Sequence, residues 1–258
     1  MQLINHVRKF TRLSSLLSTA LLLASAFVSS QAYALDYISN STTSVFTNQS
    51  TWKDPASSGM STCTKTGFYA GTAALTSTDS VFVCGGTTVT LAAPASIGRV
   101  SLMGGTLALG ANDLTVSTNV ESSAFSSSVT SSGGSLVLTD ANHILNLWNG
   151  VSSVTIPKLT LPNPTVTRTL SFTNDATFTA LSGIPTTSAG KGFVFDAGSS
   201  TVDFPVGTTI AYCEKRTVLG AINNLTCTNP PGVLPPPAVS AAIFSLKDKP
   251  AIFSEEVK

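Results

Sequence analysis

Residues 98–116 read GRVSLMGGTLALGANDLTV, and this stretch decides the fold. Three segments in it, at 100–102, 107–109 and 114–116, have apolar first and third residues around a small or polar middle one. Alternation with a period of two is typical of a strand with one buried face. The interval of seven also fits a helical heptad, but the intervening glycines and the β-branched residues disfavour a helix. The stretch therefore predicts three very short strands.

The same kind of segment recurs from Ser80 onward, for example at 81–83, 89–91, 136–138 and 154–156. Strands this short and this closely spaced do not suit the hairpins of an ordinary sandwich, but they suit a β-solenoid with coils of roughly 20 residues. Gly-Gly pairs at 85–86, 104–105 and 133–134, with Asn112-Asp113, supply the corners. Phe-rich segments after Arg168 predict a wider final core. The residues expected to point inward are Val89, Leu91, Val100, Leu102, Leu107, Leu109, Leu114, Val116, Leu136 and Leu138.

A family resemblance rests on STWKDP at 50–55, TDSVFV at 78–83, GTTVTL at 86–91, IGRVSL at 97–102 and GGTLAL at 104–109. Together these segments resemble the opening of secreted bacterial right-handed β-helix proteins, in which a Trp-containing cap precedes the first coils. The resemblance covers residues 45–120. It implies an all-β, right-handed parallel β-helix with an N-terminal cap, in a family that includes adhesins, surface repeat proteins and polysaccharide lyases. A β-sandwich of fimbrial type is the alternative fold.

The amino end has the organisation of a secretory signal peptide. A positive segment at 8–12 precedes an apolar segment at 16–28, and Ala32-Tyr33-Ala34 fits the small-x-small rule for cleavage. The rival interpretation is an uncleaved membrane anchor, but the apolar run is shorter than the roughly 20 residues that a spanning helix needs. We therefore expect a secreted, extracellular or cell-surface protein that begins near Leu35 and has no membrane span after cleavage. Removal of three basic residues leaves 11 basic against 13 acidic residues, a net charge of −2.

Changes in composition divide the rest of the chain. We expect a signal peptide at 1–34, an N-terminal cap region at 35–79, a β-solenoid domain at 80–228, and a Pro-rich linker with an apolar tail at 229–258. Three consecutive prolines at 235–237 make the linker stiff and extended. The tail either is a loosely docked terminus or pairs with a partner, another copy of this chain included. Its anchoring side chains would be Ile243, Phe244, Ile252 and Phe253.

All four cysteines, Cys63, Cys84, Cys213 and Cys227, follow the predicted cleavage site. An even count in an exported chain predicts disulfides, and three connectivities are possible. Proximity in the chain favours Cys63 with Cys84 and Cys213 with Cys227. A zinc site would need paired C-x-x-C spacing or nearby histidines, and the only histidine after the cleavage site is His143.

Candidate catalytic residues are few. His143 follows Asp140, but its neighbours offer no second charged group, so a position at a solenoid corner is the more common role. No nucleophile elbow, zinc-protease motif, phosphate loop or calcium nonapeptide occurs, and we expect neither an enzyme nor a cofactor. The aspartates are scattered singly, and the two arginines lie far apart in sequence: Asp113, Asp140, Asp175, Asp196 and Asp203, with Arg99 and Arg168. Stacked coils could bring them together in space, but nothing in their spacing requires it.

The composition argues against some classes of function but does not identify one. The chain is 42% hydrophobic and 10% charged, Ser and Thr make up about 28%, and the net charge is +1. Disorder and nucleic-acid binding are therefore disfavoured. We expect a secreted structural or adhesive surface protein that assembles into filaments through its tail. A carbohydrate-binding or polysaccharide-degrading protein is the alternative, with surface polysaccharide as the partner and Trp52, Trp148 and Tyr69 as possible sugar contacts. A fimbrial subunit is a third possibility.

Overall fold

The computed structural model describes residues 35–39, 43–55, 63, 68–70, 75–124, 126–147, 153–183 and 187–229. Apart from one short 3-10 helix, η1 at Gln49–Thr51, the regular elements of these residues are β-strands. The expected all-β class is confirmed. The chain divides into two units, 1–34 and 35–258, and the first lies wholly outside the described residues.

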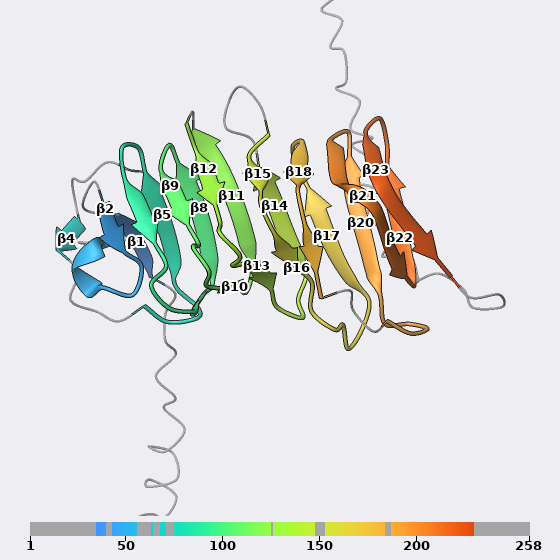
Figure 1. The fold of residues 1–258 in the computed structure, drawn as a ribbon, viewed down its shortest axis with the longest axis horizontal. Coiled ribbons are helices and arrows are strands. Elements are labelled where there is room, and N and C mark those ends of the chain that lie inside the picture. The colour runs from blue at the N-terminus through green and yellow to red at the C-terminus, as the bar shows by residue number, and fades with distance from the viewer. Residues whose placement is uncertain are drawn as a thin grey trace, which may run out of the picture. The chain divides into compact units, whose positions relative to one another are not determined.

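The strands form three faces, and each coil from β5 to β19 adds one strand to each face (Figure 1). The long face is one ten-stranded sheet that contains β4 (Phe68–Ala70), β3 (Trp52–Pro55), β1 (Asp36–Ser39), β5 (Ser80–Cys84), β8 (Arg99–Met103), β11 (Asn119–Ala124), β14 (His143–Leu147), β17 (Arg168–Phe172), β20 (Phe193–Gly198) and β22 (Cys213–Thr217). The second face has two four-stranded sheets: β2 (Thr43–Val45), β6 (Thr88–Thr90), β9 (Thr106–Ala108) and β12 (Ser128–Thr130), then β15 (Thr155–Ile156), β18 (Ala176–Phe178), β21 (Thr201–Ala211) and β23 (Ala221–Thr228). The third face contains β7 (Ala95–Ile97), β10 (Leu114–Val116), β13 (Leu136–Leu138), β16 (Leu159–Thr160) and β19 (Leu181–Ser182).

Strands pair in parallel with the strand one coil away, not with their neighbours in sequence. On the long face Val81 is in register with Val100, and Val100 with Val120. On the third face Leu114 is in register with Leu136. This arrangement is a β-solenoid, as predicted. The fimbrial β-sandwich is wrong, because such a sandwich is built from antiparallel strands, and between described strands antiparallel pairing is confined to β1 with β3 and β3 with β4.

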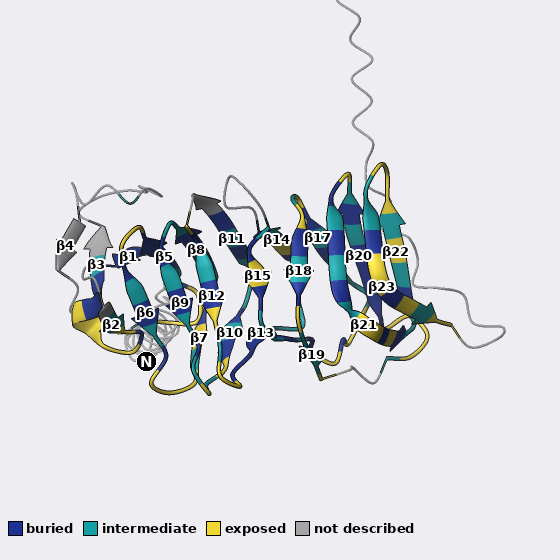
Figure 2. Cartoon of the chain, turned by 45° about the horizontal axis from the view of Figure 1, so that its top comes forward, coloured by how far each residue is buried: buried dark blue, intermediate teal, exposed yellow. Residues whose placement is uncertain are grey.

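The core runs along the inside of the coils, where it appears as dark blue bands on the strands in Figure 2. All ten residues predicted to point inward are buried, each with no more than 2% of its surface exposed. Of the residues between them, Thr90, Ala108, Thr115 and Val137 are partly exposed, whereas Ser101 is buried on the outer side of the long face. The period-two interpretation of the sequence is therefore confirmed residue by residue. Burial of an apolar side chain contributes roughly 1.5–3 kcal/mol, so this continuous core is the main stabilising element.

The first coil begins earlier than Ser80, the boundary that the sequence suggests. Strands β1 and β2 already stack in parallel on β5 and β6. Among the described residues of this region, β3 and β4 have the character of a cap, because they extend the long face in antiparallel fashion beyond β1. Residues 35–79 therefore combine a first coil with a cap.

The last two coils have a different cross-section. The third face ends at β19, and β21 is a single eleven-residue strand whose register with β23 shifts between Asp203 and Thr208. Five phenylalanines fill the core here, with Phe178 and Phe204 stacked 5.4 Å apart between ring centroids. The other three are Phe172, Phe193 and Phe195. Large aromatic side chains thus occupy the core where the coil loses one of its three sides.

The Gly-Gly pairs lie at corners of the solenoid, where the backbone conformation or the close approach of another coil requires glycine. Gly104 has a φ of 88°, a left-handed conformation that is strained for residues with a side chain. The next residue, Gly105, lies so close to the preceding coil that an added Cβ would stand 2.5 Å from the carbonyl oxygen of Cys84. Gly134 is tighter still, with an added Cβ 2.0 Å from the carbonyl oxygen of Asn112. In the pairs 104–105 and 133–134, the second glycine allows two coils to stack closely.

Candidate functional site

A groove of about 490 Å³ on the outer surface of the long face is the largest described hollow with functional groups along it. Five of its lining residues come from five successive strands, β11, β14, β17, β20 and β22, which lie side by side in Figure 1. They are directly in register, each paired with the next: Asn119, Ile144, Ser171, Asp196 and Arg216. With parallel strands about 4.8 Å apart, this row extends roughly 19 Å along the solenoid.

The row combines one apolar side chain with amide, hydroxyl and charged groups. The apolar side chain is that of Ile144, which is 43% exposed. At one end of the row Arg216 pairs with Glu214, its Nη2 lying 3.1 Å from Oε1. Asp196 neighbours Arg216 in register and accepts a hydrogen bond from the backbone of Gly198 at 3.2 Å. These groups present donors and acceptors to a polar ligand.

A second ion pair lies where the third face turns into the long face. Oδ1 of Asp140 accepts a hydrogen bond from Nε of Arg168 at 2.6 Å, and Oδ2 accepts one from the backbone of Thr165 at 3.0 Å. The hydrogen bond from Arg168, with further bonds from Thr165, lowers the pKa of Asp140 to about 2, and the same contact raises the pKa of Arg168. Asp140 is therefore a fixed carboxylate that connects two coils.

His143 has a structural environment. Its ring is 2% exposed, and its nitrogens lie 2.6 Å from the carbonyl oxygen of Thr118 and 3.0 Å from that of Thr139. His143 is among the residues that line the groove, but both of its ring nitrogens are directed at backbone carbonyls and not at Asp140. The residue connects a corner of one coil to the coil before it.

The other aspartates do not converge on one site either. Oδ1 of Asp113 accepts the backbone N–H of Ser135 at 2.8 Å, and Oδ1 of Asp175 accepts that of Thr201 at 2.7 Å. Asp203 accepts a side-chain hydrogen bond from Asn223 at 2.8 Å. Each of these carboxylates connects a coil to the next one. Within the part of the chain that the structure describes, no three His, Cys, Asp or Glu residues gather where they could hold a metal ion.

Of the three predicted sugar contacts, Trp52 is the one whose side chain the structure describes. Trp52 is 1% exposed, its indole N–H donates to the carbonyl oxygen of Phe46 at 2.8 Å, and the two rings pack edge to face. The ring is therefore buried in the first coil and is not an exposed stacking surface. Trp148 lies outside the described residues, as do Ile243, Phe244, Ile252 and Phe253. The backbone of Tyr69 lies in β4, but its side chain is not among those described.

A second hollow, of about 220 Å³, lies beside the first strand of the third face. Its lining is mainly apolar and includes Phe46, Trp52, Leu75, Pro94 and Ala95. The adjoining strand β7 is the last strand of its sheet at this end. The sequence gives no sign of this hollow, because its residues come from three separate segments.

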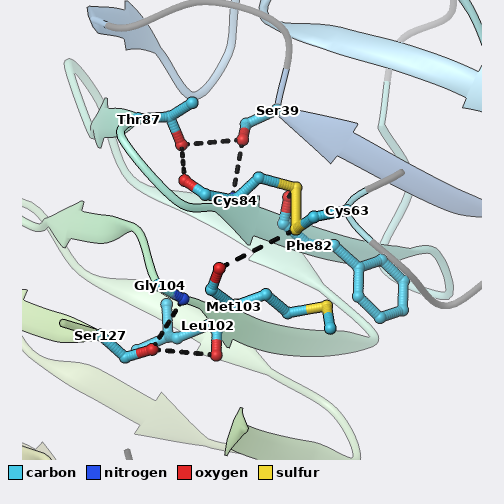
Figure 3. The surroundings of a disulfide bond; sticks show 9 residues. All are labelled: Ser39, Cys63, Phe82, Cys84, Thr87, Leu102, Met103, Gly104 and Ser127. Carbon is cyan, nitrogen blue, oxygen red and sulfur yellow. Dashed lines mark hydrogen bonds between the residues drawn. A yellow bond between two sulfur atoms is a disulfide. The ribbon is translucent and has the colours of Figure 1, made fainter. Parts of the chain in front are cut away.

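Both predicted disulfides, Cys63–Cys84 and Cys213–Cys227, are present. Figure 3 shows Cys63 bonded to Cys84 at the end of β5, next to Phe82 and Met103. These side chains and Ile38 form a small apolar cluster on the outer surface of the long face, apart from the main core. The first disulfide therefore fastens the segment that carries Cys63 onto this surface.

Sequence reasoning missed the groove. Coils of different length bring together Asn119, Ile144, Ser171 and Arg216. The steps from one paired residue of the row to the next are 25, 27, 25 and 20 residues. The only available signal was the variable spacing of the strand segments, and it does not fix the register.

Comparisons with known protein families, curated proteins and solved structures found no match to this chain. Within the described ranges, no helix is both long and apolar enough to cross a membrane.

Proposed function

We propose that the chain is a secreted structural or adhesive surface protein, whose solenoid forms the rigid part and whose C-terminal tail joins one copy to the next. The observation that carries this proposal is the difference between the two ends of the solenoid. At the amino end, β3 and β4 cover the edge of the long face. At the carboxyl end, the sheets of the described residues stop at β22, β23 and β19. Uncovered strand edges recruit further strands.

The hollow beside β7 supplies an acceptor for such a tail. The backbone N–H of Ala95 donates to Asp113, and the carbonyl of Ile97 accepts from Ser117, so both residues bond toward β10. Alternate residues of a parallel strand bond to opposite neighbours, so Ser96 directs its N–H and C=O away from β10, toward the side on which the described residues place no further strand of this sheet. An added strand there would lie next to the apolar lining, where Ile243 and Phe244 of a neighbouring copy would bury their side chains. Repetition of this contact gives an open fibre.

Light scattering on the full-length mature protein over a wide concentration range tests assembly. The variant Ser96→Pro removes the outward N–H at an exposed edge position where proline is tolerated, and Ser96→Ala is its matched control. We expect Ser96→Pro to reduce high-molecular-weight species strongly and Ser96→Ala to leave them unchanged. Deletion of residues 235–258 should abolish them. A strictly monomeric full-length protein, or a truncated form that assembles equally well, contradicts the proposal.

A second candidate function is binding of a surface polysaccharide in the groove of the long face. The in-register row from Asn119 to Arg216 favours it, since a linear array of polar groups suits a linear chain of sugars. Binding of one acidic and one neutral polysaccharide, measured by calorimetry, is the test. We expect Ser171→Trp to block the groove and abolish binding, while Thr115→Trp on the third face leaves binding unchanged. Equal binding by both variants excludes the groove.

A further inference from the structure

The carboxylate of Asp79 has an unusual set of partners for a buried charged group. The residue is 3% exposed. Its Oδ2 accepts hydrogen bonds from the backbone N–H of Thr76 at 2.7 Å and from the hydroxyl of Thr76 at 2.9 Å. Its Oδ1 accepts one from the backbone nitrogen of Leu35 at 3.0 Å, across 44 residues of sequence. The Leu35 nitrogen is thus held directly against a buried carboxylate.

Burial of a carboxylate is costly unless a cation or several donors compensate it. In the described part of the chain the ion pairs join Arg99 to Glu121, Arg168 to Asp140, and Arg216 to Glu214. None of these cations neutralises Asp79. A positive charge placed next to Oδ1 of Asp79 would therefore stabilise the folded protein.

Leu35 is also the residue at which the sequence predicts the mature chain to begin. Ala32-Tyr33-Ala34 is the expected cleavage signal, and the chain divides into its two units at the same boundary, between residues 34 and 35. Hydrolysis of the bond between Ala34 and Leu35 adds one water molecule. It leaves a carboxylate on Ala34 and an α-amino group on Leu35, which is mainly protonated at pH 7.

The position of Leu35 does not depend on its amino group. Its carbonyl oxygen accepts the backbone N–H of Ser80 at 2.7 Å, and the next residues, Asp36 to Ile38, pair in register with β5. These contacts hold the nitrogen of Leu35 beside Asp79 both before and after cleavage. Cleavage would convert one neutral N–H donor into a cation with three N–H donors at the same place, and a charge-assisted hydrogen bond is about twice as strong as a neutral one.

We propose that Asp79 is the receptor for the α-ammonium group of Leu35, so that removal of the signal peptide creates an ion pair that locks the first coil. This inference rests on the proposed export of the chain. The carboxylate of Asp79 would thus form its stabilising ion pair only after the signal peptide has been removed.

The experiment compares two forms of the protein: the exported form, whose amino terminus is identified by intact mass and N-terminal sequencing, and a form that carries Gly-Ser before Leu35. We expect the exported form to begin at Leu35 and its Tm to exceed that of the extended form by about 3 °C or more, the scale of 1 kcal/mol in a domain of this size. Asp79→Asn should lower the Tm of the exported form by several degrees and remove most of the difference between the two forms.

Asp113→Asn is the matched control, because Asp113 also accepts a backbone N–H from another coil, that of Ser135 at 2.8 Å. It should lower the Tm of both forms equally. A mature terminus at another residue overturns the ion pair but leaves export intact, whereas failure of export removes the proposed function itself. Equal Tm values for the two wild-type forms, or equal effects of Asp79→Asn in both, show that Asp79 only binds backbone amides and overturn the inference.

Discussion

Nε of Arg168 lies 2.6 Å from Oδ1 of Asp140, so an ion pair connects residues from successive coils at a corner of the solenoid. Both side chains are about three-quarters buried. The contact lowers the pKa of Asp140 and raises the pKa of Arg168.

Acid should weaken this corner. The pKa of Asp140 is about 2 in the folded protein against 3.8 ordinarily, so its stabilising contribution is complete above about pH 4 and is lost as the pH falls toward 2. Asp140→Asn should cost about 1 kcal/mol at pH 7. Urea unfolding at pH 7, 4 and 2.5 measures this, and the gap between wild type and variant should narrow at the lowest pH. A gap that is constant with pH contradicts the role of the ionised carboxylate.

The direction of the strand side chains predicts a difference in stability between substitutions on two successive strands, β9 and β10. Leu107 is 1% exposed in the core, whereas Thr115 points outward from the third face. Leu107→Asp should cost several kcal/mol because it buries an unpaired carboxylate, and Thr115→Asp should be mild. Thermal melts of the two variants measure the difference, and equal damage would show that the inward register is wrong.

Close stacking at the corners predicts a position-specific effect of one methyl group. Gly134→Ala places a Cβ against the backbone of Asn112 and should cost about 1–3 kcal/mol. Gly85→Ala is the control, because there an added Cβ meets its nearest atom at 3.7 Å, an ordinary contact. Denaturant unfolding of both variants tests this, and the prediction fails if Gly85→Ala is the more harmful change.

Peptide mapping without reduction should recover Cys63 linked to Cys84 and Cys213 linked to Cys227. A peptide that joins Cys84 to Cys213 would contradict both pairings. Replacement of Cys213 and Cys227 together by serine should lower the free energy of unfolding by roughly 3 kcal/mol, the loop-closure value for a loop of this length. The measurement is denaturant unfolding without a reducing agent.

Much of the fold could be predicted from the sequence because the physical signal is local. Alternation between apolar and polar residues determines which side of a short strand is buried, as at Leu114 and Val116, whatever the strand pairs with. The outer cluster of Ile38, Phe82 and Met103 escaped prediction because β5 is buried on both surfaces, and a period of two indicates only one buried face.

The candidate groove is harder to predict, because its register depends on loops. The pairing of Ser171 with Asp196 requires a coil of 25 residues, and that of Asp196 with Arg216 requires one of 20. Polar loops tolerate such differences in length at little cost in free energy. The sequence therefore indicates which residues face outward, but not which of them stand side by side.

The two disulfides lie at opposite ends of the stack, Cys63–Cys84 near its first coils and Cys213–Cys227 within its last coil. In a stack where each coil touches only its neighbours, unravelling starts most easily at a terminal unit, which has one neighbour instead of two. The disulfide at each end of the stack therefore opposes unfolding of the terminal coils. Such a stack would unfold first in its middle and would resist unravelling from its two ends.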